Sequence, residues 1–261
     1  VQRAPQDFTS WEAIYRTLVT AFPADRYHQG ATLTDFDNRE GTVRAHIDGH
    51  GMVEADVLVA ADGAQSPTRR RFLPDLASTY AGYVAWRGTL DEAEAAPELV
   101  RFFDDAFTFC EARSAGHILV YFIPGDGADT TLGKRRLNWV WYVGVGEAEL
   151  PRLLIDREGR QHHASLPLGG TPEAAIRDLR DLARREVHPM LASLVAATPQ
   201  PFLQTIADVI PTRTVFAACA FSATRRSLSG RTRPAPPPRQ LVTRRLWRAR
   251  SNGPAGTSTP A

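Results

Sequence analysis

The sequence predicts an α/β protein with two folded parts, one built on a parallel sheet with helices and one of α+β type with a mostly antiparallel sheet. The first part follows from the apolar run at residues 57–61, which does not alternate and leads through a glycine turn into a helix start, as in strands buried on both faces. The second follows from strand-like runs between residues 80 and 145, separated by Gly, Pro and Asp turns. We therefore divide the chain into residues 1–79, residues 80–210 and a tail, residues 211–261.

Helix and turn signals define the elements of the first part. A capping pattern at residues 9–12 precedes apolar residues at helical spacing as far as Phe22, where a proline ends the run, so we expect an amphipathic helix. Alternating apolar residues at 43–53, interrupted by Asp-Gly-His-Gly, predict a hairpin. Ser66 followed by proline is typical of a helix N-cap, so a helix is expected to begin there after the strand.

The second part reads as strands followed by helices. Its strand-like runs lie at residues 83–86, 107–109, 117–123 and 138–145. Thr171-Pro-Glu opens a helix that is expected to end near Val187, and a short helix is expected at 191–197. This order predicts an antiparallel sheet with helices packed against it.

Composition excludes several classes of protein. The chain has 261 residues and is 43% hydrophobic, which is enough for a sizeable core. Its apolar runs are far shorter than the roughly 20 residues needed to cross a bilayer, and its start does not resemble a signal peptide, so we expect a cytoplasmic protein without a membrane span. Cys110 and Cys219 lack metal-ligand spacing, and His162 and His163 lie in a polar turn, so no metal site is expected.

The most informative stretch for function is the turn after the strand at 57–61. Asp62 and Gly63 end the strand, Ser66 caps the next helix and Arg69 lies in its first turn. Glycine permits close approach of a ligand to the backbone, and helix N-terminal amides attract anions such as a pyrophosphate. A generic strand-turn-helix with a solvated basic face is the alternative, because such a turn is specific only in its structural context.

The pattern Asp62-Gly63-x-x-Ser66-x-x-Arg69 after a buried strand resembles a motif of the single-component FAD-dependent aromatic-ring hydroxylases, the para-hydroxybenzoate hydroxylase class of flavoprotein monooxygenases. Within that class the sequence is most similar to the 2,6-dihydroxypyridine 3-monooxygenase branch. The branch resemblance rests on three further stretches, which lie at residues 80–88, 138–142 and 201–208. It extends over residues 8–210.

The resemblance implies an FAD-binding domain and a substrate-binding domain, here at residues 1–79 and 80–210. It places Asp62, Gly63, Ser66 and Arg69 near FAD and the nicotinamide cofactor, and implies that Arg16 reaches toward the flavin nucleotide. For Arg16 the alternative is a solvated helix cation. The catalytic base stays unassigned.

The same resemblance places Tyr83, Trp86 and Arg87 at the start of the substrate domain, although aromatic residues there also pack sheets. The implied reaction is hydroxylation of a small aromatic or heteroaromatic ring with molecular oxygen, using FAD and NAD(P)H. Whether NADH or NADPH serves is left open, and a homodimer is an open option for the assembly.

The family's opening GxGxxG turn and its later Gly-Asp motif do not occur in this sequence. We therefore expect a partial FAD-binding domain that lacks its N-terminal βαβ unit, with weak FAD binding and little activity. A non-enzymatic remnant or binding module is the alternative.

The tail has a different composition from the rest of the chain. Residues 211–261 contain ten arginines and no acidic residue, whereas the preceding residues are net acidic. The codons for residues 221–232, read two bases later, can spell Leu-Gly-Asp-Ala-Ala, so we expect a shifted reading frame and disorder. The competing interpretation is a basic arm that binds nucleic acid or another polyanion.

Overall fold

The computed structural model describes residues 8–39, 41–63, 65–104, 106–211, 213–221 and 246–250. The chain divides into two compact units, which we describe separately. Unit 1 comprises Val1–Leu18, Gly82–Ile206 and Pro234–Ala261, and unit 2 comprises Val19–Ala81 and Ala207–Arg233. The boundary between unit 2 and the following part of unit 1 thus falls after residue 81, whereas the sequence suggested a boundary after residue 79. The chain returns to unit 2 after residue 206.

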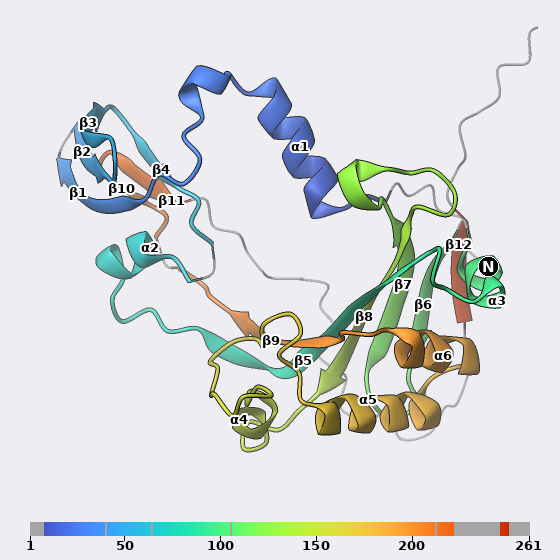
Figure 1. Ribbon diagram of the computed structural model, residues 1–261. Coiled ribbons are helices and arrows are strands. Elements are labelled where there is room, and N and C mark those ends of the chain that lie inside the picture. Colours follow the sequence, from blue (N-terminus) through green and yellow to red (C-terminus); the bar gives the residue numbers. More distant parts are fainter. Residues whose placement is uncertain are drawn as a thin grey trace, which may run out of the picture. The chain divides into compact units, whose positions relative to one another are not determined.

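A six-stranded sheet forms the centre of unit 1 (Figure 1). Its strand order is β12-β6-β7-β8-β5-β9. The strands are β5 (Thr79–Asp91), β6 (Ala106–Glu111), β7 (His117–Ile123), β8 (Arg136–Gly144), β9 (Phe202–Asp208) and β12 (Leu246–Arg250). The pairs β5/β8, β7/β8, β6/β7 and β12/β6 are all antiparallel, which confirms the predicted sheet type.

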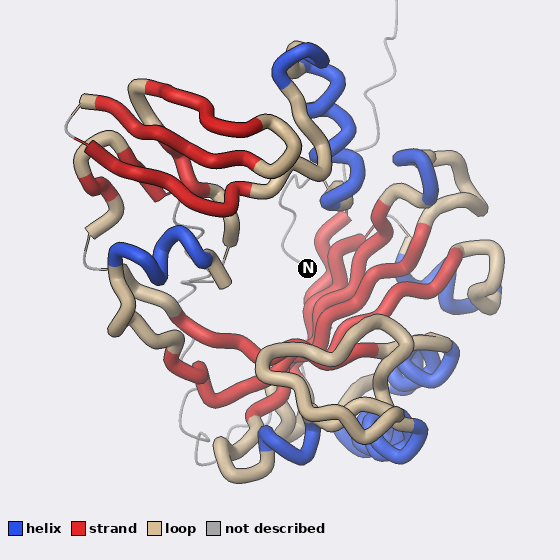
Figure 2. Tube along the Cα trace, turned by 60° about the vertical axis from the view of Figure 1, so that its left-hand side comes forward, coloured by secondary structure: helices blue, strands red, loops and turns tan. Residues whose placement is uncertain are grey.

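Helices cover one face of this sheet. They are α3 (Pro97–Phe103), α5 (Glu173–Glu186) and α6 (Pro189–Ala197), with the short α4 (Leu150–Leu153) and the 3-10 turn η2 (Asp126–Ala128) in the connections. The core contains Trp139 and Trp141 from β8 and Leu191 and Leu194 from α6, all fully buried. We call the opposite side of the sheet, which none of these helices covers, the open face (Figure 2).

Unit 2 contains two small sheets. The first is an antiparallel meander of β1 (Leu33–Arg39), β2 (Thr42–Ile47) and β3 (Gly51–Ala55). The second has the order β10-β11-β4 and consists of β4 (Leu58–Ala60), β10 (Val215–Phe216) and β11 (Cys219–Phe221). Because β11 pairs parallel with β4, the predicted parallel strand is confirmed, and its partner comes from more than 150 residues further along the chain.

Two predictions about these strands need correction. Val57 and Val59 are 58% and 61% exposed, so β4 is not buried on both faces. The reason is that no described element packs on the face that carries these two valines; β4 is also an edge strand of its three-stranded sheet. The expectation of a disordered tail does not hold for β10, β11 and β12, which are paired strands. Residues 222–245 and 251–261, on which the frameshift and polyanion-arm hypotheses depend, lie outside the described residues.

Helices α1 (Trp11–Ala21) and α2 (Pro67–Phe72) begin as the sequence predicted, and a 3-10 turn, η1 (Ala24–Arg26), follows α1. Ser10 Oγ accepts a hydrogen bond from the Ala13 amide at 3.1 Å and so caps α1. The helix buries none of its residues. No helix in the described part of the chain is long and apolar enough to span a membrane.

Candidate functional site

The turn after β4 has the conformation that its sequence predicted. Gly63 has a φ of +78°, which glycine adopts without strain, and a Cβ at this position would meet no atom within 4 Å. Ser66 caps α2, because its Oγ accepts a hydrogen bond from the Arg69 amide at 2.8 Å. The turn therefore leaves the space beside the Gly63 Cα open, at a half-buried position, and has a fixed helix start at Ser66.

The chain's own side chains occupy amides at the start of α2. Asp62 Oδ2 accepts from the Thr68 amide at 3.2 Å, and Ser66 Oγ takes the next one. Burial acts to raise the pKa of Asp62, but hydrogen bonds from Ser66 and Thr68 outweigh it and hold that pKa below its ordinary value. A negative carboxylate that already bonds this helix start disfavours a phosphate there and suits a hydroxyl group better.

The arginines of α2 fold back onto the chain. Arg69 Nη1 donates to the Gly63 carbonyl at 3.1 Å, and Arg70 Nη1 donates to the Gln65 carbonyl at 2.6 Å. Main-chain carbonyl oxygens therefore accept hydrogen bonds from both cations.

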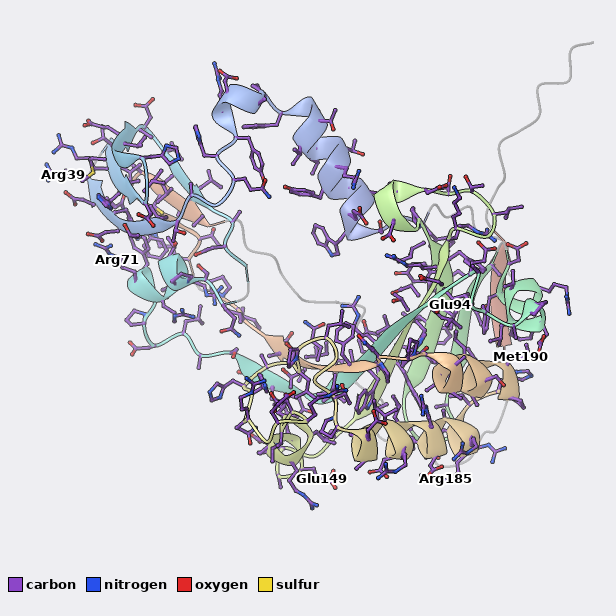
Figure 3. The ribbon with its side chains drawn as sticks, in the orientation of Figure 1. Arg39, Arg71, Glu94, Glu149, Arg185 and Met190 are labelled. Atoms are coloured by element: carbon purple, nitrogen blue, oxygen red, sulfur yellow. The ribbon has the colours of Figure 1, made fainter. Side chains whose placement is uncertain are left out.

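Arg71 connects α2 to the β-meander of unit 2. Its guanidinium forms an ion pair with Asp35 on β1 and lies 4.4 Å from the centre of the Phe36 ring (Figure 3). The hydrogen bond from Arg71 is the main cause of the lowered pKa of Asp35. Arg71 therefore has a structural partner within its own unit.

Arg16 lies on α1 and pairs with Glu12 one turn earlier, with 3.1 Å between Nε and Oε1. Its side chain is more than half exposed. This is an ordinary helix-surface ion pair. Unlike the four residues of the turn, which the structure brings together, Arg16 falls in unit 1, and its role toward a nucleotide stays a prediction.

Strand β5 separates the three predicted substrate residues. Trp86 is 5% exposed and packs in the helix-covered core opposite Trp141 of β8. Side chains alternate across a strand, so Tyr83 and Arg87 lie on the open face instead. Trp86 therefore packs in the core, and Tyr83 and Arg87 remain the candidates for contact with a substrate.

Arg87 is a half-buried cation on the open face. Its Nη1 donates to Gln204 Oε1 at 3.3 Å, and its guanidinium lies 5.9 Å from the centre of the Phe202 ring. Among the described residues, no carboxylate lies within 4.0 Å of it. An anionic group on a ligand would find a cation here that is not already neutralised.

The open face also carries aromatic side chains that are not among the site residues predicted from the sequence. On β6 and β7, Phe107 stacks on Tyr121 with 5.7 Å between ring centres, and Phe8 from the N-terminal segment stacks on both. The alternation His-x-Leu-x-Tyr from residue 117 was the available signal, because every second residue of a strand shares a face. The register that aligns these side chains with those of the neighbouring strands could not be read from it.

A second aromatic group continues across the sheet. Phe109, His117 and Tyr142, on β6, β7 and β8, follow one another with 5.1 Å between ring centres, and Tyr83 of β5 meets Tyr142 edge to face at 5.9 Å. These residues are half-buried. A sheet face lined in this way can hold a flat ring by stacking.

The described residues contain no group of three or more His, Cys, Asp or Glu side chains placed to hold a metal ion. Both cysteines are buried free thiols, and burial raises the pKa of each.

Comparisons with known proteins identify related sequences. A family model described as FAD binding domain-like matches residues 80–208. The chain is 32% identical over 210 residues to a 2,6-dihydroxypyridine 3-monooxygenase of Paenarthrobacter nicotinovorans, which covers 80% of this chain and 51% of that protein. It is 31% identical over 112 residues to a 3-amino-4-hydroxybenzoate 2-monooxygenase of Streptomyces cremeus, which covers 43% of this chain and 27% of that protein. The chain thus spans about half the length of the first relative.

Solved structures share the fold. A 2,6-dihydroxypyridine-3-hydroxylase from Arthrobacter nicotinovorans superposes with a TM-score of 0.71 at 30% identity, over 82% of this chain and 53% of that one. HpxO of Klebsiella pneumoniae, solved with FAD and uric acid, superposes with a TM-score of 0.51 at 21% identity, over 81% of this chain and 46% of that one.

Proposed function

From the relationship of this chain to the FAD-dependent aromatic-ring hydroxylases, we propose that it supplies the ring-binding part of such a monooxygenase. The substrate would be a small aromatic or heteroaromatic ring, hydroxylated with molecular oxygen, in the cytoplasm. The single observation that supports this best is the open face, where Arg87 lacks a carboxylate partner among the described residues and aromatic side chains line the neighbouring strands. We further propose that the protein acts as a homodimer.

FAD, when bound, supplies the oxygen chemistry, and NAD(P)H would supply the reducing electrons. The turn after β4 fits a supporting role toward the cofactor. Gly63 offers open backbone, and the ionised carboxylate of Asp62 suits a cofactor hydroxyl rather than a phosphate. We propose that Ser66 and Arg69 hold the shape of this turn, and that Arg16 lies nearer the nucleotide. Because the helix-start amides already have protein acceptors, we expect weak FAD binding and little turnover by this chain alone.

Calorimetric titration of the full chain tests the proposal. We expect 2,6-dihydroxypyridine to bind at least about tenfold more tightly than glutarimide, its saturated analogue, because only the aromatic ring can stack on the open face. Equal affinity for the two rings, or binding of neither, would refute a ring-binding function. A parallel FAD titration with NADH and NADPH oxidation measured separately tests the cofactor proposals.

A further inference from the structure

The strand at one margin of the six-stranded sheet comes from the tail of the chain. β12 pairs with β6 on the outer side of that strand, and β7 pairs with β6 on the inner side (Figure 1). Residues 222–245 connect β12 to β11, so the two paired strands lie far apart in the sequence. If β12 were removed, β6 would end the sheet, and its outer backbone groups would lose their partners.

β6 has the sequence of a strand that associates when its edge is free. Residues 106–110 read Ala-Phe-Thr-Phe-Cys, without a charge, a proline or a glycine. Such a segment favours strand pairing and lacks the charges that normally keep an edge strand from pairing with other molecules. The β12 pairing covers these five residues and stops before Glu111, the charged residue of the strand.

β12 replaces this uncharged edge with a charged one. Its five residues, Leu-Trp-Arg-Ala-Arg, include two arginines, and charge on an edge strand opposes the addition of another strand. Residues 211–261 contain no acidic residue, whereas the preceding residues are net acidic, so electrostatic attraction favours a bound tail. β12 thus has the properties of a cover for the edge of β6.

The sequence of β6 is complementary to itself. Two antiparallel copies centred on Thr108 would set Phe107 against Phe109 and Ala106 against Cys110, in pairs that share a face of the sheet. Thr108 would then face its own equivalent. Its Oγ1 is buried and has no hydrogen-bond partner among the described residues, and threonines paired across two strands can bond each other. A second copy of β6 would therefore satisfy a hydroxyl that the described structure leaves unpaired.

We infer that the outer edge of β6 is a self-association surface, which β12 keeps closed. When β12 leaves, two copies of the chain pair through β6, and the sheet continues from one molecule into the other. A tethered strand has an effective concentration on the order of mM, so the closed state prevails while the protein is more dilute than that. The inference goes beyond the proposed ring-binding function and does not depend on it. A homodimer that forms while β12 is in place uses another surface.

The first test asks whether β12 covers β6 in the intact chain. Leu246→Cys places a thiol in register with the native Cys110, and paired residues of antiparallel strands lie within disulfide distance. After oxidation with oxidised glutathione, we expect an intramolecular disulfide, detected by mass spectrometry of the monomer. Thr257→Cys, beyond β12, should not bond Cys110. If both variants give the same yield, or if Leu246→Cys forms no such bond, β12 is not a cover.

The second test opens the edge in the full chain. Arg248→Pro combined with Ala249→Pro removes backbone donors from β12. In that chain, Ala106→Cys supplies a thiol that only Cys110 of a second copy can reach, because the two positions lie too far apart along one strand. We expect at least about tenfold more disulfide-linked dimer than in an Ala106→Cys chain with an intact tail, where the tethered strand competes.

Matched variants control this measurement. Thr257→Pro combined with Ser258→Pro adds the same two prolines beyond β12 and should leave the dimer yield at the intact-tail value. Cys110→Ser should abolish the linked dimer. If the chain with prolines in β12 links no more than this control, or still links after Cys110→Ser, self-association through β6 is refuted. Loss of its circular dichroism spectrum refutes it as well, because the inference requires unit 1 to keep its fold without β12. None of these readouts involves ring binding, so the proposed function is tested separately.

Discussion

Single side chains on the open face determine which charges and rings a ligand there would meet. Arg87 has an amide and an aromatic ring as its partners, and no carboxylate among the described residues neutralises its charge. In contrast, Arg71 of unit 2 pairs with the carboxylate of Asp35 and lies over the Phe36 ring. The sequence alone could not distinguish these two arginines, because the residues that contact each of them lie far along the chain.

Replacing Arg87 should therefore weaken binding of acidic rings selectively. We expect Arg87→Met to reduce the affinity for 6-hydroxynicotinate about tenfold or more, since a hydrogen bond between charged groups contributes about 1.5–3 kcal/mol. The affinity for 2,6-dihydroxypyridine, which has no carboxylate, should change little. Calorimetry with both ligands measures the difference, and Arg185→Met on α5 (Figure 3) is the matched control. A similar loss of affinity for both ligands would show that Arg87 does not bind the carboxylate.

Burial lowers the pKa of His117, and the lowered pKa predicts how stability depends on pH. Between the lowered folded pKa and the ordinary value of about 6.5, the unfolded chain binds a proton that the folded chain does not, so stability falls as pH falls through this window. We expect His117→Gln to flatten that decline. Urea unfolding of both proteins at several pH values measures it. Parallel curves for the two proteins would count against the assigned shift.

At the scale of elements, β5 packs tightly against the C-terminal end of α6. A Cβ on Gly88 of β5 would lie 2.6 Å from Thr198 Cγ2 and 2.8 Å from the Trp139 ring. Trp139 Nε1 also donates to Thr198 Oγ1 at 2.8 Å, so the contact is fixed by a buried hydrogen bond. The absence of a side chain at residue 88 is thus a packing requirement and not a turn signal.

Gly88→Ala should destabilise the protein by about 1–3 kcal/mol, the usual cost of adding an atom to a filled core. Gly144→Ala at the end of β8 is the control, because a Cβ there meets nothing within 4 Å, and we expect a change below about 0.5 kcal/mol. Urea unfolding monitored by tryptophan fluorescence compares the two variants. Equal effects would mean that β5 and α6 can move apart.

The elements predicted most accurately are those whose structure is determined by their own residues. The spacing in α1, the capping of α2 by Ser66 and the strand character of β5 to β8 are local properties, and all are confirmed. The parallel pairing of β4 with β11, the burial of Trp86 and the choice of open-face residues depend on partners far along the chain. These three features are determined only when strands from distant parts of the chain pair in the sheet.

At the scale of the whole chain, the two units have very different cores. Among the described residues, the core of unit 1 draws on five strands and three helices. In unit 2 the buried core consists of Phe36, Val43, Ala45 and Ala218, with a few half-buried neighbours. Because burial of apolar surface is the main source of stability, unit 2 should open more easily than unit 1.

Hydrogen exchange measured by mass spectrometry tests this difference. We expect amides of β1 to β3 to exchange at least about tenfold faster than amides of β7 and β8, which corresponds to about 1.4 kcal/mol of opening free energy. Slower exchange in β1 to β3 than in β8 would show that the small core is not the weaker one.

The exposed Val57, just before β4, and Val59, within it, have a practical implication for handling the protein. In the described structure this edge strand offers free backbone groups next to Val57 and Val59, which is the arrangement that recruits a strand from another molecule. Concentrated solutions should consequently form oligomers by strand addition, visible in sedimentation velocity. Val59→Lys should keep the protein monodisperse, since charge at a strand margin opposes such growth.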